Sequence, residues 1–138
     1  MAEVGITAIG AVVEGTWVYS GDATGTTTVS WLPGQRFLVQ DGTLTVLGQT
    51  HHAHEVIGHI KPFGAAEAEE QVTSRAYTDT GDTLDYTWEL DGDTLTIWGG
   101  PKGSPAYATG RISPDQDHIA GEWTWPGGGY RYQMTRQR

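Results

Sequence analysis

Four of the five histidines in the chain lie within the short segment QTHHAHEVIGHI. They are His51, His52, His54 and His59. Histidine titrates near neutral pH and its neutral ring is a common metal ligand, so the segment is a candidate for proton transfer or for metal binding. Two histidines at positions i and i+2 of a strand can chelate a metal ion, but a closed site needs a third or fourth ligand. No nearby pattern supplies that ligand, and we therefore predict no metal site.

The dipeptide His54–Glu55 is the candidate for proton transfer. If the segment is one strand, His54 and Glu55 point to opposite faces. Glu55 then shares its face with His51 and His59. At the mouth of a pocket, an inward-pointing member of this pair could act as a general acid or base in an isomerisation or cyclisation. The alternative is that both are rim residues in contact with water.

Other catalytic chemistries lack their usual residues. The chain has no cysteine, which removes thiolate nucleophiles, disulfides and cysteine-based zinc sites. It has no Gly-x-Ser-x-Gly elbow, no phosphate-binding loop and no dinucleotide fingerprint. Paired carboxylates such as Asp91 and Asp93 fall in turns, where turn formation explains them. We therefore disfavour a hydrolase, kinase or dehydrogenase and expect no cofactor.

The charge balance limits the partners. Seventeen acidic residues against eight basic ones give a formal net charge of -9, which disfavours nucleic acid and anionic membranes as partners. No run approaches the ~20 apolar residues that span a bilayer. The N-terminus lacks the basic region of a signal peptide, so we expect a cytoplasmic protein. At 138 residues, the chain is expected to form one domain, residues 1–138, as a monomer or homodimer.

The elements that must position these residues are strands. About ten segments rich in Thr, Val, Trp and Tyr alternate with glycine-rich turns at short, even spacing. The short links favour antiparallel neighbours, and no crossover helix for a parallel sheet appears. The segment GAAEAEEQ, Gly64–Gln71, is predicted to be a helical turn or a loop, and MAEVGITAIG is too β-like and glycine-containing to predict a helix. The pattern leaves an up-and-down barrel or a sandwich.

Aromatic residues dominate the apolar faces of these strands. Tyr86 and Trp88 share one face of TLDYTWEL with Leu84 and Leu90. Buried tyrosine and tryptophan need hydrogen-bond partners, which a barrel lumen holding water and ligand provides more easily than a sandwich core. Ordinary core aromatics remain the alternative. The candidate ligand-binding residues are Trp31, Arg75, Tyr77, Tyr86, Trp88, Trp98, Tyr107, Arg111, Trp123 and Tyr132, with the two arginines as possible anchors for a carboxylate or enolate oxygen.

A family resemblance supports the barrel. The tripeptide Gly15–Trp17 is similar to the Gly-x-Trp signature of the lipocalin and calycin superfamily. In that superfamily the tryptophan packs under a basic side chain of the last strand, here Arg131 or Arg136. The motifs GTWVYSG, WLPGQRFLVQ, EVIGHI, LDGDTLTIWG and GEWTWPGGGYRYQMTR resemble, over about residues 12 to 138, an uncharacterised bacterial family of lipocalin-like barrels.

The resemblance implies an all-β fold: a single closed antiparallel up-and-down barrel of eight to ten strands with a central pocket. Its outline is similar to that of fatty-acid-binding proteins and nitrobindins. Members of the family usually begin with a short capping helix, which the N-terminus of this chain does not predict. Nitrobindins bind haem through a histidine near the C-terminal end, but His118 lies among acidic and polar residues, which disfavours haem here.

Two functions of different classes follow. The first is a binding protein that holds a hydrophobic or aromatic small molecule in the barrel lumen. The second is an enzyme that folds a flexible substrate, for example a polyketide-like one, and accelerates its cyclisation or isomerisation inside the barrel. The sequence leaves open whether the protein is an enzyme.

Overall fold

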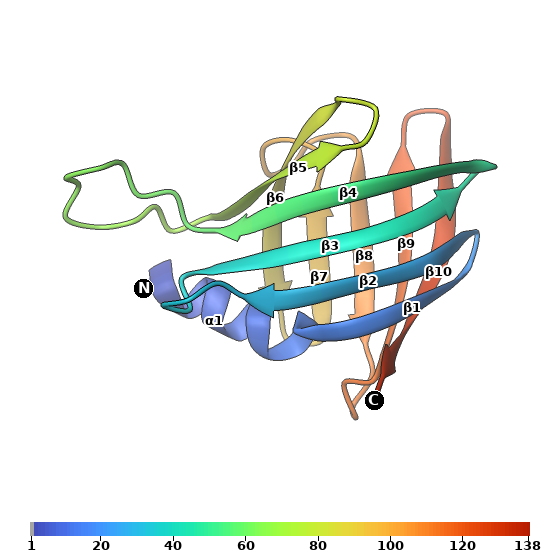
Figure 1. Cartoon of the computed structure of the whole chain (residues 1–138), viewed down its shortest axis with the longest axis horizontal. Coiled ribbons are helices and arrows are strands. Elements are labelled where there is room, and N and C mark those ends of the chain that lie inside the picture. The colour runs from blue at the N-terminus through green and yellow to red at the C-terminus, as the bar shows by residue number, and fades with distance from the viewer. Residues whose placement is uncertain (1) are drawn as a thin grey trace.

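A computed structural model describes residues 2–138, with side chains from residue 5 onward. A helix, α1 (Ala2–Val13), precedes ten strands in this part of the chain. The strands are β1 (Gly15–Gly21), β2 (Ala23–Trp31), β3 (Phe37–Val46), β4 (Gln49–Gly58), β5 (Val72–Thr78), β6 (Thr83–Asp91), β7 (Thr94–Trp98), β8 (Tyr107–Ile112), β9 (His118–Trp125) and β10 (Gly128–Gln137). The segment Gly64–Gln71 is a loop that extends away from the barrel (Figure 1).

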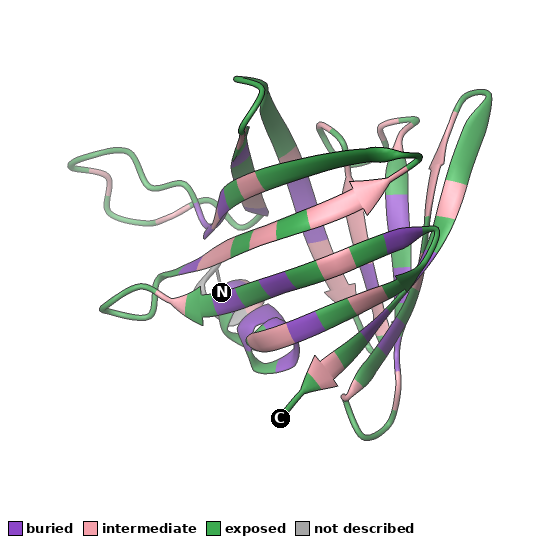
Figure 2. Ribbon diagram, turned by 45° about the vertical axis from the view of Figure 1, so that its right-hand side comes forward, coloured by how far each residue is buried: buried purple, intermediate pink, exposed green. Residues whose placement is uncertain are grey.

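The strands form one closed antiparallel barrel. Each strand pairs with its neighbours in the chain, and β1 pairs with both β2 and β10, which closes the sheet. This confirms the predicted all-β up-and-down barrel, with a strand number at the top of the expected range. The side chains alternate between buried and exposed along the strands (Figure 2). Among the described residues, no helix is long and apolar enough to cross a membrane.

The N-terminal helix corrects the expectation of a non-helical N-terminus. Ile6, Ile9 and Val13 are buried and recur at helical spacing, so packing against the barrel stabilises a helix that local propensity alone does not favour. α1 contacts β3, β5 and β6. Gly10 permits this approach, because a Cβ atom there would overlap the ring of Trp31.

Trp17 and Arg136 seal the end of the barrel next to α1. The Trp17 side chain is fully buried, and its Nε1–H donates to the Val13 carbonyl oxygen at 2.9 Å. The Arg136 guanidinium carbon lies 4.3 Å from the centre of the Trp17 ring, a cation–π contact. Of the two arginines that the family resemblance allowed, Arg136 therefore makes this contact. Arg131 lies outside the barrel and pairs with Glu122.

The two ends of the barrel differ in packing. Leu38, Ile57 and Val72 lie at the strand ends next to α1 and are buried in one hydrophobic cluster with the helix. The opposite end carries the β3–β4, β5–β6 and β9–β10 hairpins, and α1 does not reach it (Figure 1). The barrel therefore has a closed end under α1 and a mouth at the opposite end.

Candidate functional site

The barrel encloses a cavity of about 470 Å³. Every strand contributes residues to its wall, β8 only through Gly110, and Val13 of α1 contributes at the closed end. The cavity reaches the mouth, where Gln49, His51 and Asp82 line it. This volume lies within the range of small-molecule sites in proteins.

A hydrogen-bonded relay surrounds a buried carboxyl group in the wall. Glu55 of β4 is 7% exposed, and its Oε2 accepts a hydrogen bond from Ser74 Oγ of β5 at 2.6 Å. Ser74 Oγ in turn accepts from Trp88 Nε1 of β6 at 2.9 Å. On the other side, Gln40 of β3, the cross-strand neighbour of Glu55, donates from Nε2 to Oε1 at 3.2 Å. Four neighbouring strands therefore hold this group in place.

Burial changes the acidity of Glu55. Removal from water disfavours the charged carboxylate and raises the pKa of Glu55 above its usual value. The hydrogen bonds from Ser74, Gln40 and Trp88 act in the opposite direction but do not cancel the effect of burial. Glu55 therefore keeps its proton to higher pH than an exposed glutamate, which suits a general acid or base.

Tyrosines form much of the remaining polar wall. Burial raises the pKa of Tyr19, Tyr86, Tyr130 and Tyr132, to about 12 for Tyr130. All four therefore remain neutral phenols near neutral pH, able to hydrogen-bond but not to act as bases. Tyr130 and Tyr132 have ring centres 6.2 Å apart, and Tyr132 lies 5.7 Å from Tyr19. Gly121 makes room for the Tyr132 ring, which a Cβ atom there would overlap.

Thr27 carries a buried hydroxyl group in the wall of the cavity, next to Tyr19. Its side chain is 4% exposed, lines the cavity, and its Oγ1 makes no hydrogen bond. Burial raises the pKa of Tyr19, and the Thr27 hydroxyl beside it lowers this pKa slightly in the opposite direction. The two hydroxyl groups nevertheless do not meet the geometry of a hydrogen bond. A buried hydroxyl without a partner is rare in folded proteins. Because this oxygen is closed off by its neighbours, Thr27 contributes to the packing of the wall.

Five of the residues that the sequence analysis selected come together in this cavity. They are Glu55, Tyr86, Trp88, Trp123 and Tyr132. Tyr86 and Trp123 pack against each other with ring centres 6.0 Å apart. Thr27, Gln40 and Ser74, which the sequence analysis did not select, also line the cavity or hold Glu55. Only the alternation of side chains along each strand could have placed them on an inward face, because threonine, glutamine and serine are common on any strand.

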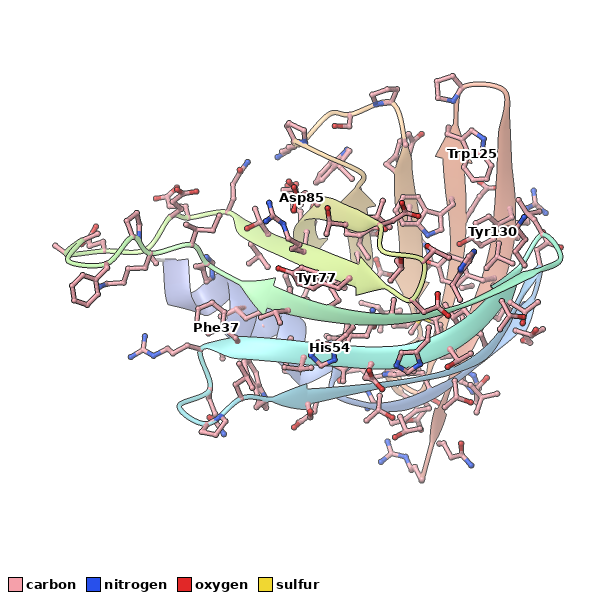
Figure 3. All side chains as sticks on the ribbon, turned by 45° about the horizontal axis from the view of Figure 1, so that its top comes forward. Phe37, His54, Tyr77, Asp85, Trp125 and Tyr130 are labelled. Carbon is pink, nitrogen blue, oxygen red and sulfur yellow. The ribbon has the colours of Figure 1, made fainter. Side chains whose placement is uncertain are left out.

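His54, the other member of the pair selected for proton transfer, lies outside the barrel (Figure 3). It belongs to the outward face of β4, since the inward face holds Glu55. His54 Nδ1 is 3.3 Å from Asp41 Oδ1, and His52 Nε2 is 3.0 Å from the same oxygen. The hydrogen bond from His54, followed by that from His52, lowers the pKa of Asp41. This trio is exposed on the surface and faces no cavity.

The other two histidines of the segment have separate roles. His51 shares the inward face with Glu55 and lines the mouth, with Nδ1 3.4 Å from Asp79 Oδ1. His59 is buried beyond the end of β4, where its Nε2 accepts from the Ile6 backbone N–H of α1 at 3.2 Å. Its Nδ1 donates to the carbonyl oxygen of Glu69 at 2.9 Å. No group of three or more metal-ligating side chains occurs among the residues that the structure describes.

Both arginines selected as lumen anchors lie on the outer surface. Arg75 alternates with the inward residues Ser74 and Ala76, so it points outward and donates from Nε to Asp85 Oδ1 at 2.7 Å. Arg111 likewise lies outside, with Nη1 3.4 Å from Asp93 Oδ2. Neither arginine therefore brings a guanidinium group into the lumen, where the buried ionisable group is the carboxyl of Glu55.

The remaining four selected aromatic residues also lie outside the cavity. Tyr77 and Tyr107 occupy outward positions and are exposed. Trp98 lies next to the Lys102 ammonium group, 5.8 Å from its ring centre. Trp31 is at the closed end, where it packs against Gly10 of α1. These residues were selected because they are aromatic. Whether a side chain faces inward depends instead on which of the two alternating faces of its strand it occupies.

Together, the fold and the site define a class: a closed ten-stranded antiparallel barrel, compatible with a lipocalin-like fold, with an aromatic-walled cavity that holds the carboxyl group of Glu55. No family model matches the chain, and no curated protein matches it.

Proposed function

We propose that this protein belongs among the lipocalin-like barrels and binds a hydrophobic or aromatic small molecule in its lumen. The observation that carries the proposal is the cavity of about 470 Å³, which opens at one end and has Tyr86, Trp88 and Trp123 in its wall. Aromatic side chains supply large apolar contact areas, and a few polar groups fix the orientation of a bound molecule. Gln40 and Glu55 are such groups.

Filling the lumen tests this proposal. Ala53 lines the cavity, whereas its neighbour His54 points outward. We expect Ala53→Phe to weaken binding of the neutral fluorescent probe N-phenyl-1-naphthylamine by at least tenfold, because the added ring occupies ligand volume. His54→Phe, the matched control, should change the dissociation constant less than twofold. Equal effects of the two substitutions, or no binding of the probe to the unmodified protein, would contradict a binding function of the lumen.

A second candidate, an enzyme for cyclisation or isomerisation, is favoured by the raised pKa of Glu55 inside the cavity. A carboxyl group in an apolar pocket can donate or abstract a proton near neutral pH. The ring opening of 5-nitrobenzisoxazole needs only one general base, and the change in absorbance of the product measures its rate. We expect the unmodified protein to accelerate this reaction at least tenfold more than Glu55→Gln. Equal rates would argue against proton transfer by Glu55.

A further inference from the structure

Building on the proposed function, we infer that the lumen binds a small organic cation, an aromatic or aliphatic amine whose ammonium group pairs with Glu55. The inference rests on the direction of the hydrogen bonds around Glu55, on the absence of a nearby positive charge, and on the chemistry of the wall and mouth.

The relay around Glu55 has a fixed direction. An indole N–H can only donate, so Ser74 Oγ accepts the hydrogen bond from Trp88 Nε1. The single hydrogen of the Ser74 hydroxyl is therefore free to point at Glu55 Oε2, only 2.6 Å away. The relay thus presents a donor to the carboxyl group, an arrangement that stabilises its charged form.

No side chain provides the opposite charge. Among the described residues that line the cavity there is no lysine or arginine. His51, the one basic residue in that set, lies four residues away along β4, or roughly 13 Å at the usual rise of a strand. Arg75, Arg111 and Arg131 pair with carboxylates on the outer surface. A buried carboxylate without a positive partner is costly, and a cationic ligand would remove that cost.

The groups that face Glu55 from other strands are compatible with a cation. The charge of Glu55 contributes to the raised pKa of Tyr19 on β1 and of Tyr86 on β6, and both are neutral phenols. Tyr86, Trp88 and Trp123 also offer ring faces, which attract ammonium groups.

The approach to the cavity also favours positive charge. Asp82 lines the mouth, and Asp79 lies beside it as the partner of His51. The whole chain carries a formal net charge of -9. Such a field concentrates cations at the entrance and repels anions. An anionic ligand would be repelled by this field at the mouth and by the Glu55 carboxylate inside the cavity.

A matched series of ligands tests the inference by isothermal titration calorimetry at pH 7.5. Tryptamine carries an ammonium group, 3-ethylindole is its neutral counterpart of similar shape, and indole-3-acetate is the anionic one. We expect tryptamine to bind at least tenfold more tightly than 3-ethylindole, and indole-3-acetate to bind most weakly. Glu55→Gln should abolish the preference for tryptamine, so that it binds no more tightly than 3-ethylindole does to the same variant. Glu122→Gln removes the same charge from the outer surface and should preserve the preference.

The pH dependence provides a second measurement that needs no variant. Tryptamine stays protonated between pH 5 and 8, so its affinity should rise with pH as Glu55 loses its proton. Equal binding of tryptamine and 3-ethylindole, or an affinity for tryptamine independent of pH, would overturn the inference but leave the proposed function intact. The same holds if tryptamine fails to bind while the neutral naphthylamine probe binds. If neither binds, the proposed function fails as well.

Discussion

Glu55 is the residue through which the stability of this barrel should depend on pH. Burial raises its pKa in the folded state above that in the unfolded chain. Between these two values the folded protein binds more protons than the unfolded one, so the free energy of unfolding falls as pH rises. The stabilising contribution of protonated Glu55 is complete below the unfolded pKa and is lost as pH rises through the folded pKa.

Glu55→Gln should remove this dependence. The amide keeps an oxygen that can accept from Ser74 and stays neutral at every pH. We expect the variant to match the unmodified protein near pH 4 and to exceed it by about 1–2 kcal/mol at pH 8. Urea unfolding at several pH values measures this difference. Glu122→Gln, at an exposed site, should show no such trend. A Glu55→Gln variant that is less stable at pH 8 would indicate that the relay outweighs burial.

The sequence separated His54 from Glu55 correctly, because neighbouring residues of a strand point to opposite faces. It did not determine which of the two faces inward. That choice depends on how ten strands close on one another, which is a property of pairing far along the chain. The same limit explains Arg75 and Tyr77, whose residue types suggested a ligand site although they alternate with the small inward residues Ser74 and Ala76.

At the scale of elements, α1 is joined to the last strand by one side chain. Arg136 of β10 donates to the carbonyl oxygens of Val12, at 2.7 Å, and of Glu14 at the end of the helix. It also lies over the Trp17 ring. The last carbonyl groups of a helix have no partner within the helix, so a cation there supplies hydrogen bonds and offsets the helix dipole. This contact joins residues more than a hundred positions apart in the chain.

Removing this side chain should destabilise the protein strongly. We expect Arg136→Met to lower the free energy of unfolding by about 2–4 kcal/mol, because the carbonyl oxygens of Val12 and Glu14 lose their donor and Trp17 loses its cation. Arg131→Met lies on the same strand but outside the barrel, and should change it by less than about 0.5 kcal/mol. Guanidinium unfolding of both variants gives the comparison. Equal losses would show that Arg136 does not hold the closed end.

The composition of α1 explains why local sequence did not predict this helix. The segment contains Gly5 and Gly10 and several β-branched residues, which lower helix propensity. Its stability comes from the burial of Ile6 and Ile9 and from close contacts that need glycine, as at Gly10 against Trp31. These are tertiary effects, and local propensity does not contain them.

For the whole molecule, the sequence predicted the architecture well, because regular strand spacing and short turns leave few alternatives to an antiparallel barrel. The contact that closes one end could also be predicted, because the family resemblance pairs Trp17 with a basic residue of the last strand. The lumen was harder to predict. Its defining polar groups, Thr27, Ser74 and Glu55, are ordinary strand residues, and only three-dimensional packing brings them into one buried site.

The separation of the closed end from the mouth has a consequence for how this barrel could change over time. Trp17, Arg136 and α1 stabilise one end, while the other end carries the hairpins between strands, among them those around residues 47–48, 79–82 and 126–127. Substitutions in those hairpins do not touch the residues that hold the barrel shut. Natural selection or protein engineering can therefore change the residues of the mouth, and with them the molecules that enter, without changing the contacts that stabilise the closed end.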